Sequence, residues 1–182
     1  MQTRFSEELE KVVDYARDEA MRTGYYAICT EHLLLGVLRH CNNSACRALE
    51  ASGMDLDILK RRIDAQILRS ESIPYDDQDD IFLSRDAQNA LSLTILEASL
   101  RGVEQAGAAD LLLAITKCES CPCRDIFLAS GISHDSLLSL LAAGPAPEGE
   151  LQEPSEEDMR NAILFGLDRI GNYLDTDTKI AS

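Results

Sequence analysis

Apolar residues recur every three or four positions at the start of the chain, which predicts an amphipathic first helix. Ser6 precedes this pattern as an N-cap, and Gly24 follows it as the residue that ends the helix. The apolar positions between them are Leu9, Val12, Val13, Ala16 and Ala20.

Three further helices are expected before residue 68. Thr30 is predicted to cap a second helix that is apolar around most of its circumference, so this helix should be the buried centre. A third helix is expected from about Ser44 to Gly53, and a fourth after Asp55. The apolar residues of the second and fourth helices are Leu33, Leu34, Leu35, Val37 and Leu38, and Leu56, Leu59, Ile63 and Ile67.

The same pattern returns later in the chain at a constant offset. Gly24 and Gly102 are 78 residues apart, and that offset aligns Leu33-Leu34-Leu35 with Leu111-Leu112-Leu113. It also aligns Ala51-Ser52-Gly53 with Ala129-Ser130-Gly131. One register held over so many residues indicates a duplicated unit.

The predicted fold is therefore all-α, with two tandem four-helix repeats. Copy one covers 4–68 and copy two 82–142, with Ser84 and Ser133 as helix caps in copy two. Because a unit of about 60 residues is marginal alone, the copies should pack together as one pseudo-two-fold body within 1–143.

Two polar segments flank the second copy. The acidic connector 69–80, which contains Pro74 and the sequence Asp-Asp-Gln-Asp-Asp, lacks the glycine and final glutamate of a calcium-binding loop and is predicted to be a solvated linker. A flexible Pro/Glu-rich linker is expected over 144–158, followed by an amphipathic helix and tail over 159–182 that faces a partner or another domain.

Charge narrows the range of partners. The 182 residues include 32 acidic and 17 basic side chains, a formal charge of −15, which disfavours nucleic acid and membrane surfaces and favours cationic polypeptide segments. No apolar run is long enough to cross a bilayer, and the N-terminus lacks the apolar segment of a secretion signal. A cytoplasmic location is expected.

One segment carries a family resemblance. The string Thr30-Glu31-His32-Leu33-Leu34-Leu35-Gly36, together with Phe5-Ser6 and Gly53-Met54-Asp55, resembles the N-terminal repeat of Clp-family AAA+ unfoldases. The resemblance covers about residues 4–142 and is weaker in copy two, where the string reads Ala108-Ala109-Asp110-Leu111-Leu112-Leu113-Ala114. The segment Leu167–Leu174 is similar to the peptide that leads into the first ATPase module of these proteins.

The resemblance implies a docking domain that captures substrates or adaptor proteins for a Clp unfoldase or protease. In some relatives the acidic residue of each Thr-Glu-His string helps to bind phosphoarginine, and here that role carries over only to Glu31, since Ala109 holds the equivalent position next to Asp110. The candidate peptide- or adaptor-binding residues are Ser6, Thr30, Glu31, His32 and Asp110.

These residues also have structural interpretations. Glu31 near a helix N-terminus stabilises the helix dipole by about 0.3–1 kcal/mol. His32 fits helix packing as well as it fits a binding role. If relatives are a guide, copy one carries most of the binding, because copy two has lost all three side chains of the string.

Catalytic signatures are absent from the sequence. It contains no phosphate-binding loop, no His-Glu-x-x-His zinc helix and no Gly-x-Ser-x-Gly elbow, and its three histidines form no evident triad. The chain is therefore expected not to be an enzyme and to need no cofactor.

The cysteines leave one other chemistry open. Cys118, Cys121 and Cys123 have a spacing that can bind zinc. By the 78-residue offset they occupy the loop of copy two that is equivalent to the loop of His40, Cys41 and Cys46 in copy one, and a four-ligand site could form if the two loops face each other. A zinc or redox sensor on a helical scaffold is accordingly one alternative function. A free-standing Clp-repeat protein that regulates the Clp machine is the other.

Overall fold

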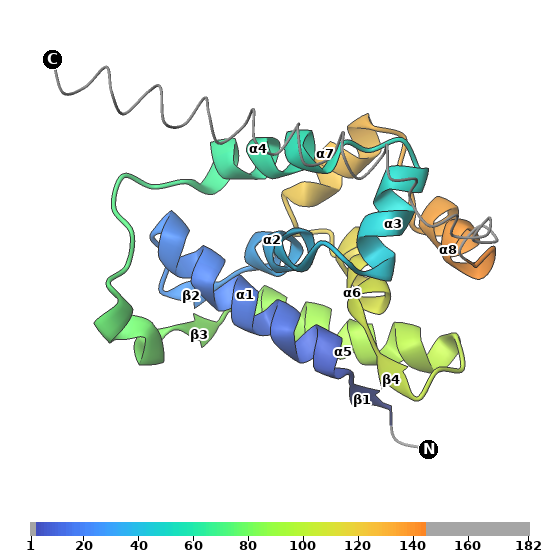
Figure 1. Ribbon diagram of the computed structural model, residues 1–182, viewed down its shortest axis with the longest axis horizontal. Coiled ribbons are helices and arrows are strands. Elements are labelled where there is room, and N and C mark those ends of the chain that lie inside the picture. Colours follow the sequence, from blue (N-terminus) through green and yellow to red (C-terminus); the bar gives the residue numbers. More distant parts are fainter. Residues whose placement is uncertain (1–2, 145–182) are drawn as a thin grey trace, which may run out of the picture. The chain divides into compact units, whose positions relative to one another are not determined.

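The computed structural model describes residues 3–144, and these contain eight α-helices, four from each predicted copy. Copy one forms α1 (Glu7–Thr23), α2 (Thr30–His40), α3 (Ser44–Ala51) and α4 (Leu56–Ile67). Copy two forms α5 (Arg85–Leu100), α6 (Ala108–Lys117), α7 (Cys123–Ala129) and α8 (His134–Ala142). The predicted all-helical class is confirmed (Figure 1). The predicted linker beyond Gly144 and the predicted C-terminal helix lie outside the described residues.

The helices begin where polar side chains can satisfy the first free amides. Ser6 Oγ accepts from the Leu9 amide and Ser84 Oγ from the Ala87 amide, each at 3.1 Å. Gly24 adopts a left-handed φ of 86°, which ends α1 without the steric cost that a side chain would bring.

The predicted cap of α2 is wrong by one residue. Cys29 is the extended N-cap with φ −94° and ψ 174°, and Thr30 is the first helical residue. The reason is that His32, at the third helical position, accepts the Cys29 amide on Nδ1 at 2.9 Å. This bond fixes the helix start without a side-chain cap from Thr30.

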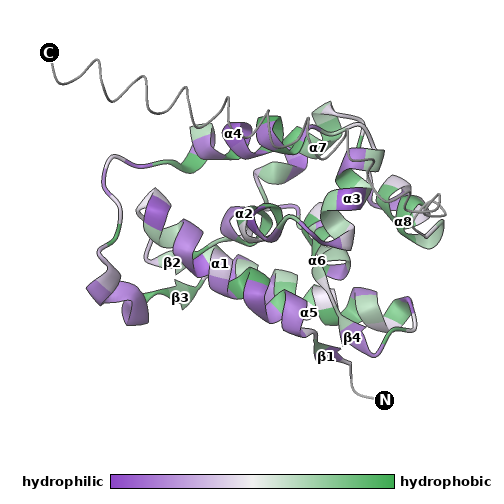
Figure 2. Cartoon of the chain, in the orientation of Figure 1, coloured by the Kyte–Doolittle hydropathy of each residue, from purple (hydrophilic) through white to green (hydrophobic). Residues whose placement is uncertain are grey.

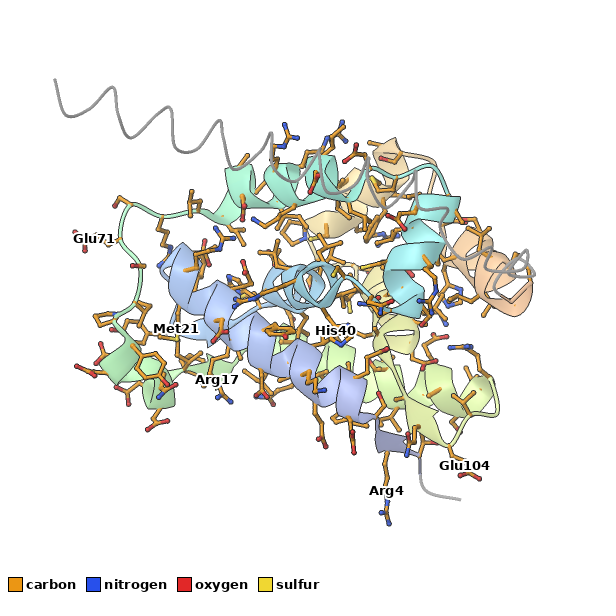
Figure 3. All side chains as sticks on the ribbon, viewed as in Figure 1. Arg4, Arg17, Met21, His40, Glu71 and Glu104 are labelled. Atoms are coloured by element: carbon orange, nitrogen blue, oxygen red, sulfur yellow. The ribbon has the colours of Figure 1, made fainter. Side chains whose placement is uncertain are left out.

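Four two-residue strands were not predicted. β1 (Arg4–Phe5) pairs in parallel with β4 (Gln105–Ala106), and β2 (Ala27–Ile28) pairs in parallel with β3 (Phe82–Leu83). Each pair joins one copy to the other. The two pairs are equivalent under the 78-residue offset, because Arg4 opposite Gln105 corresponds to Phe82 opposite Ala27. Figure 3 shows Arg4 and Glu104 at the β1–β4 end of the molecule.

The connector between the copies is more ordered than the sequence indicates. None of its residues Tyr75–Asp80 is buried, as expected for a solvated linker, but these residues form a 3-10 helix, η1. The Tyr26 hydroxyl donates to Asp77 Oδ2 at 2.9 Å and so ties η1 to the residue that precedes β2.

The core lies along α2 and α6. Leu33, Leu34 and Leu35 of α2 and their equivalents in α6 are at most 1% exposed, as the sequence predicts for a central helix. The outer helix α1 carries hydrophilic and hydrophobic bands (Figure 2), so that one face packs on α2 while the other stays polar. No helix within residues 3–144 is both long and apolar enough to cross a membrane.

Candidate functional site

The first candidate site is the N-terminus of α2, where Thr30, Glu31 and His32 form the first three helical residues. Thr30 is 2% exposed and donates its hydroxyl to Glu31 Oε2 at 3.0 Å. Glu31 is 9% exposed, so its carboxylate sits at the edge of the protein interior.

Glu31 forms no ion pair with a described residue. Moving a carboxylate out of water costs free energy unless a positive charge or several hydrogen bonds compensate it. The α2 N-terminus is therefore suited to receive a cationic group from another molecule.

His32 has a structural role beneath Glu31. Its ring is fully buried, accepts the Cys29 amide on Nδ1, and lies 2.9 Å from the Thr23 hydroxyl through Nε2. Burial, followed by the charges of Arg22 and Arg69, lowers the pKa of His32 to about 4. The neutral imidazole thus stabilises the start of α2 through its contacts with Cys29 and Thr23, and its buried position keeps it from contact with a ligand.

The second candidate site is the equivalent N-terminus of α6, and it is built differently. Asp110 is 2% exposed, accepts the Gly107 amide at 2.9 Å, and pairs with Arg101 Nη1 at 2.7 Å. Asp110 therefore occupies the capping position that His32 holds in copy one. Its charge is already balanced inside the protein.

Ser6 belongs to this second site and not to the first. Its hydroxyl lies near Gly107, where an added Cβ would sit 3.8 Å from Ser6 Oγ. Glu8, which was not among the predicted site residues, accepts the amide of Ala108 at 3.0 Å. The five candidates are thus divided between two places, with Thr30, Glu31 and His32 at one and Ser6 and Asp110 at the other.

The 78-residue offset could have identified further residues near the α2 N-terminus that the sequence analysis did not name. It relates Ser6 and Glu8 to Ser84 and Asp86. In the structure these two residues lie beside Cys29, at the α2 N-terminus. Burial, with the negative charge of Glu31 second, raises the pKa of the Cys29 thiol.

A cluster of thiols completes the surroundings of Glu31. Cys118, Cys121 and Cys123 are all buried. A hydrogen bond from Cys123, with a contribution from Thr30, lowers the pKa of Cys121, and the pKa of Cys123 is raised chiefly by the same thiol pair. The α2 N-terminus is thus lined by polarisable, hydrogen-bonding groups in addition to its carboxylate.

The condition for a joint site with Cys41 and Cys46, that the two loops face each other, is not reflected in the neighbours of these thiols. Cys41 is exposed and neighbours Cys46, whereas Cys121 and Cys123 neighbour Glu31. Within residues 3–144, no three His, Cys, Asp or Glu side chains are grouped so that they could hold a metal ion. The expectation that the chain needs no cofactor and the zinc-binding alternative both stay untested.

Comparisons with known proteins identify the family of this chain. Residues 4–130 match the family model of the Clp repeat (R) N-terminal domain. The negative regulator of genetic competence ClpC/MecB of Bacillus subtilis is 30% identical over 114 residues, which cover 63% of this chain and 14% of that protein. The chaperone protein ClpB of Oceanobacillus iheyensis is 24% identical over 180 residues, covering 97% of this chain and 22% of that one.

Solved structures show the same fold. The N-terminal domain of ClpD from Arabidopsis thaliana superimposes with a TM-score of 0.60 at 14% identity, covering 77% of this chain and 96% of that domain. The Hsp104 N-terminal domain from Candida albicans gives 0.61 at 16% identity, with 75% and 88% covered. The present chain spans less than a quarter of the length of the two curated relatives above. Its sequence, its duplicated helices and this shared fold place it in one family: the chain belongs to the Clp repeat (R) N-terminal domain family.

Proposed function

We propose that this chain is a protein-binding module that docks substrates or adaptor proteins for a Clp-type ATP-dependent unfoldase or protease, with no catalysis of its own. Family membership and the fold shared with N-terminal domains of Clp-type proteins support this role. The relatives are several times longer than this chain, so the unfolding activity belongs to other parts of such machines or to partner subunits.

The observation that carries the proposal is the carboxylate of Glu31. It is almost buried, accepts a hydrogen bond from Thr30 and forms no ion pair in the described part of the chain. A guanidinium or ammonium group of a bound polypeptide would supply the missing charge with charge-assisted hydrogen bonds. The excess of acidic side chains over the whole sequence adds long-range attraction for such a segment.

Binding is proposed to be one-sided. The equivalent of Glu31 in copy two is Ala109, which offers no charge, and the neighbouring Asp110 is already paired with Arg101. The other carboxylate at the α6 N-terminus, that of Glu8, already accepts the Ala108 amide, so the carboxylate proposed for a cationic partner is that of Glu31 at the α2 N-terminus. If the chain binds phosphoarginine-bearing substrates, copy one alone would bind them.

A transplant experiment tests the docking role. Residues 1–182 are fused in place of the N-terminal domain of a Clp unfoldase, and degradation of an unfolded substrate is followed with the matching protease. The fusion should restore degradation lost on domain removal, and Glu31→Gln should reduce the restored rate about tenfold. Glu50→Gln, the same change at an exposed position of α3, is the matched control. A fusion that restores nothing, or a Glu31→Gln fusion as active as the control, overturns the proposal.

A further inference from the structure

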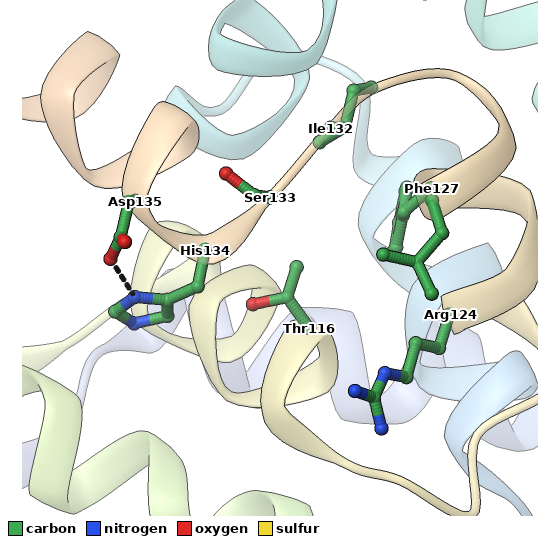
Figure 4. A pocket seen from close by; sticks show the side chains of 8 residues that line it. Thr116, Arg124, Phe127, Ile132, Ser133, His134 and Asp135 are labelled. Atoms are coloured by element: carbon green, nitrogen blue, oxygen red, sulfur yellow. Dashed lines mark hydrogen bonds and ion pairs between the residues drawn. The ribbon is translucent and has the colours of Figure 1, made fainter.

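A pocket of about 230 Å³ lies in copy two, away from both helix N-termini described above. It is formed by the C-terminal end of α6, by α7 and by the start of α8. Phe127 and Ile132 supply apolar walls, while Thr116, Arg124 and His134 supply polar groups (Figure 4).

The duplicated sequence explains why this pocket is open. The positions equivalent to Thr116 and His134 in copy one are Leu38 and Leu56. Leu38 is only 9% exposed and packs into the core of copy one. Replacing a leucine by the shorter, polar threonine leaves space that the surrounding helices do not fill.

The polar groups of the pocket carry an available positive charge. Arg124 forms an ion pair only with Glu119 among the described residues, at 4.0 Å, and the Glu119 side chain is 90% exposed. A pair of that length and exposure contributes little, so the guanidinium can turn to another anion. In Figure 4, Arg124 lies on the α7 side of Thr116 and His134 on the α8 side.

At the opposite edge of the pocket, His134 lies next to two carboxylates. His134 Nε2 lies 3.2 Å from the buried Glu97, and its Nδ1 lies 3.5 Å from Asp135. The Asp135 side chain is 98% exposed, so water screens its charge. The stronger local attraction for a ligand is therefore the one that Arg124 exerts on an anion.

We propose that this pocket binds the C-terminal residue of a polypeptide, with its apolar side chain against Phe127 and Ile132 and its α-carboxylate on Arg124. The volume is below the range of pockets for drug-sized ligands but accommodates one side chain and its carboxylate. A guanidinium binds a carboxylate through two parallel hydrogen bonds, which fixes the orientation of the chain end. The proposal rests on the proposed polypeptide-binding function and adds a second site, in copy two, with a different ligand chemistry.

Binding of short peptides to the full chain tests this site. The probe is an acetylated Gly-Gly-Gly-Leu peptide with a free C-terminus, and its amidated form is the negative probe. Titration followed by NMR or calorimetry should show that the free acid binds at least about tenfold more tightly than the amide. Arg124→Gln should remove that difference, whereas Arg17→Gln, the same charge change on α1, should keep it.

Further measurements test the role of the pocket rim, the need for a polypeptide ligand and the independence of this site from Glu31. Asp135→Asn should leave binding of the free acid unchanged or tighten it, because it removes a negative charge at the rim. N-acetyl-leucine tests whether a small carboxylate suffices; affinity equal to that of the peptide would overturn a polypeptide ligand. Equal binding of acid and amide, or binding unaffected by Arg124→Gln, would overturn the proposal altogether. Glu31→Gln should not alter this titration, so failure here leaves the proposed docking role standing.

Discussion

Glu31 and Asp110 are the two acidic residues that begin α2 and α6, yet their carboxylates have different surroundings. Asp110 caps Gly107 and pairs with Arg101, so removing its charge would unbalance the protein interior. Glu31 contacts only the Thr30 hydroxyl among the hydrogen-bonding and ionic partners described. These surroundings give Asp110 a structural role and are the reason why the binding role is proposed for Glu31.

His32 makes folding stability depend on pH. Its pKa is about 4 in the folded protein and 6.5 in an unfolded chain, so the unfolded state takes up the proton first as the pH falls. The stabilisation is fully present above about pH 6.5 and is lost as the pH falls towards 4, by roughly 3 kcal/mol. Urea unfolding at a series of pH values should show this decline in the free energy of unfolding.

The variant His32→Gln tests the assignment, because glutamine keeps an acceptor for the Cys29 amide but cannot be protonated. Its stability should change less between pH 6.5 and 4 than that of the wild type. His40→Gln, at the far end of the same helix, is the control and should keep the wild-type slope. An unchanged slope in His32→Gln would show that the pH dependence comes from other groups.

At the scale of elements, α1 and α2 approach each other closely at Gly36. A Cβ at Gly36 would overlap the Val12 carbonyl oxygen and would lie 3.0 Å from the Ala16 amide nitrogen. Both obstacles are backbone atoms of a helix, which can yield only if the helix moves. In α6 the equivalent residue is Ala114, which indicates that the corresponding crossing with α5 has room for a methyl group.

Gly36→Ala should therefore destabilise the fold by about 1–3 kcal/mol, although alanine is the better helix former. Thermal unfolding followed by circular dichroism measures the loss. The reciprocal change, Ala114→Gly, should cost only about 1 kcal/mol, through helix propensity and a small lost contact. A Gly36→Ala protein as stable as the wild type would contradict the close packing of α1 on α2.

The elements also show what the sequence can and cannot reveal. Helical periodicity and the 78-residue offset located all eight helices of the described residues, because apolar residues at helical spacing, N-caps and terminal glycines recur in both copies. The four strands were missed, since two residues such as Arg4 and Phe5 are too few for an alternating pattern. Cys29 was missed as a cap because cysteine is not a favoured N-cap residue.

The candidate site was predictable only in part. The family string identified Thr30, Glu31 and His32, but the sequence could not show that His32 points inward. Nor could it show that Ser6 lies beside the α6 N-terminus, since that contact crosses between the copies. The pocket beside Arg124 depends on the smaller side chain of Thr116 at the position equivalent to Leu38, and such a volume difference forms no sequence motif.

At the scale of the whole described unit, the copies are joined through their strands and helices. Each strand pair takes one strand from each copy, α3 of copy one packs on α6 and α8 of copy two, and α2 packs on α5 and α6. A separated copy would expose these apolar surfaces to water. The two copies should consequently fold as one cooperative unit.

Cutting the chain in the connector tests this cooperativity. A fragment of residues 1–73 should show little helical circular dichroism alone and should regain it when mixed with a fragment of residues 74–182. The intact chain should unfold in urea in a single transition. A fragment 1–73 that folds alone with a cooperative transition would contradict the dependence of copy one on copy two.

The central claim, that copy one binds a cationic group through Glu31, is tested most directly by one equilibrium measurement. A fluorescent peptide with a single arginine, unmodified or phosphorylated on the guanidinium, is titrated with the wild type, Glu31→Gln and Asp110→Asn, each checked for folding. The account predicts that Glu31→Gln weakens binding of at least one form about tenfold while Asp110→Asn leaves it unchanged. Binding that survives Glu31→Gln, or that is lost only in a folded Asp110→Asn, would contradict it.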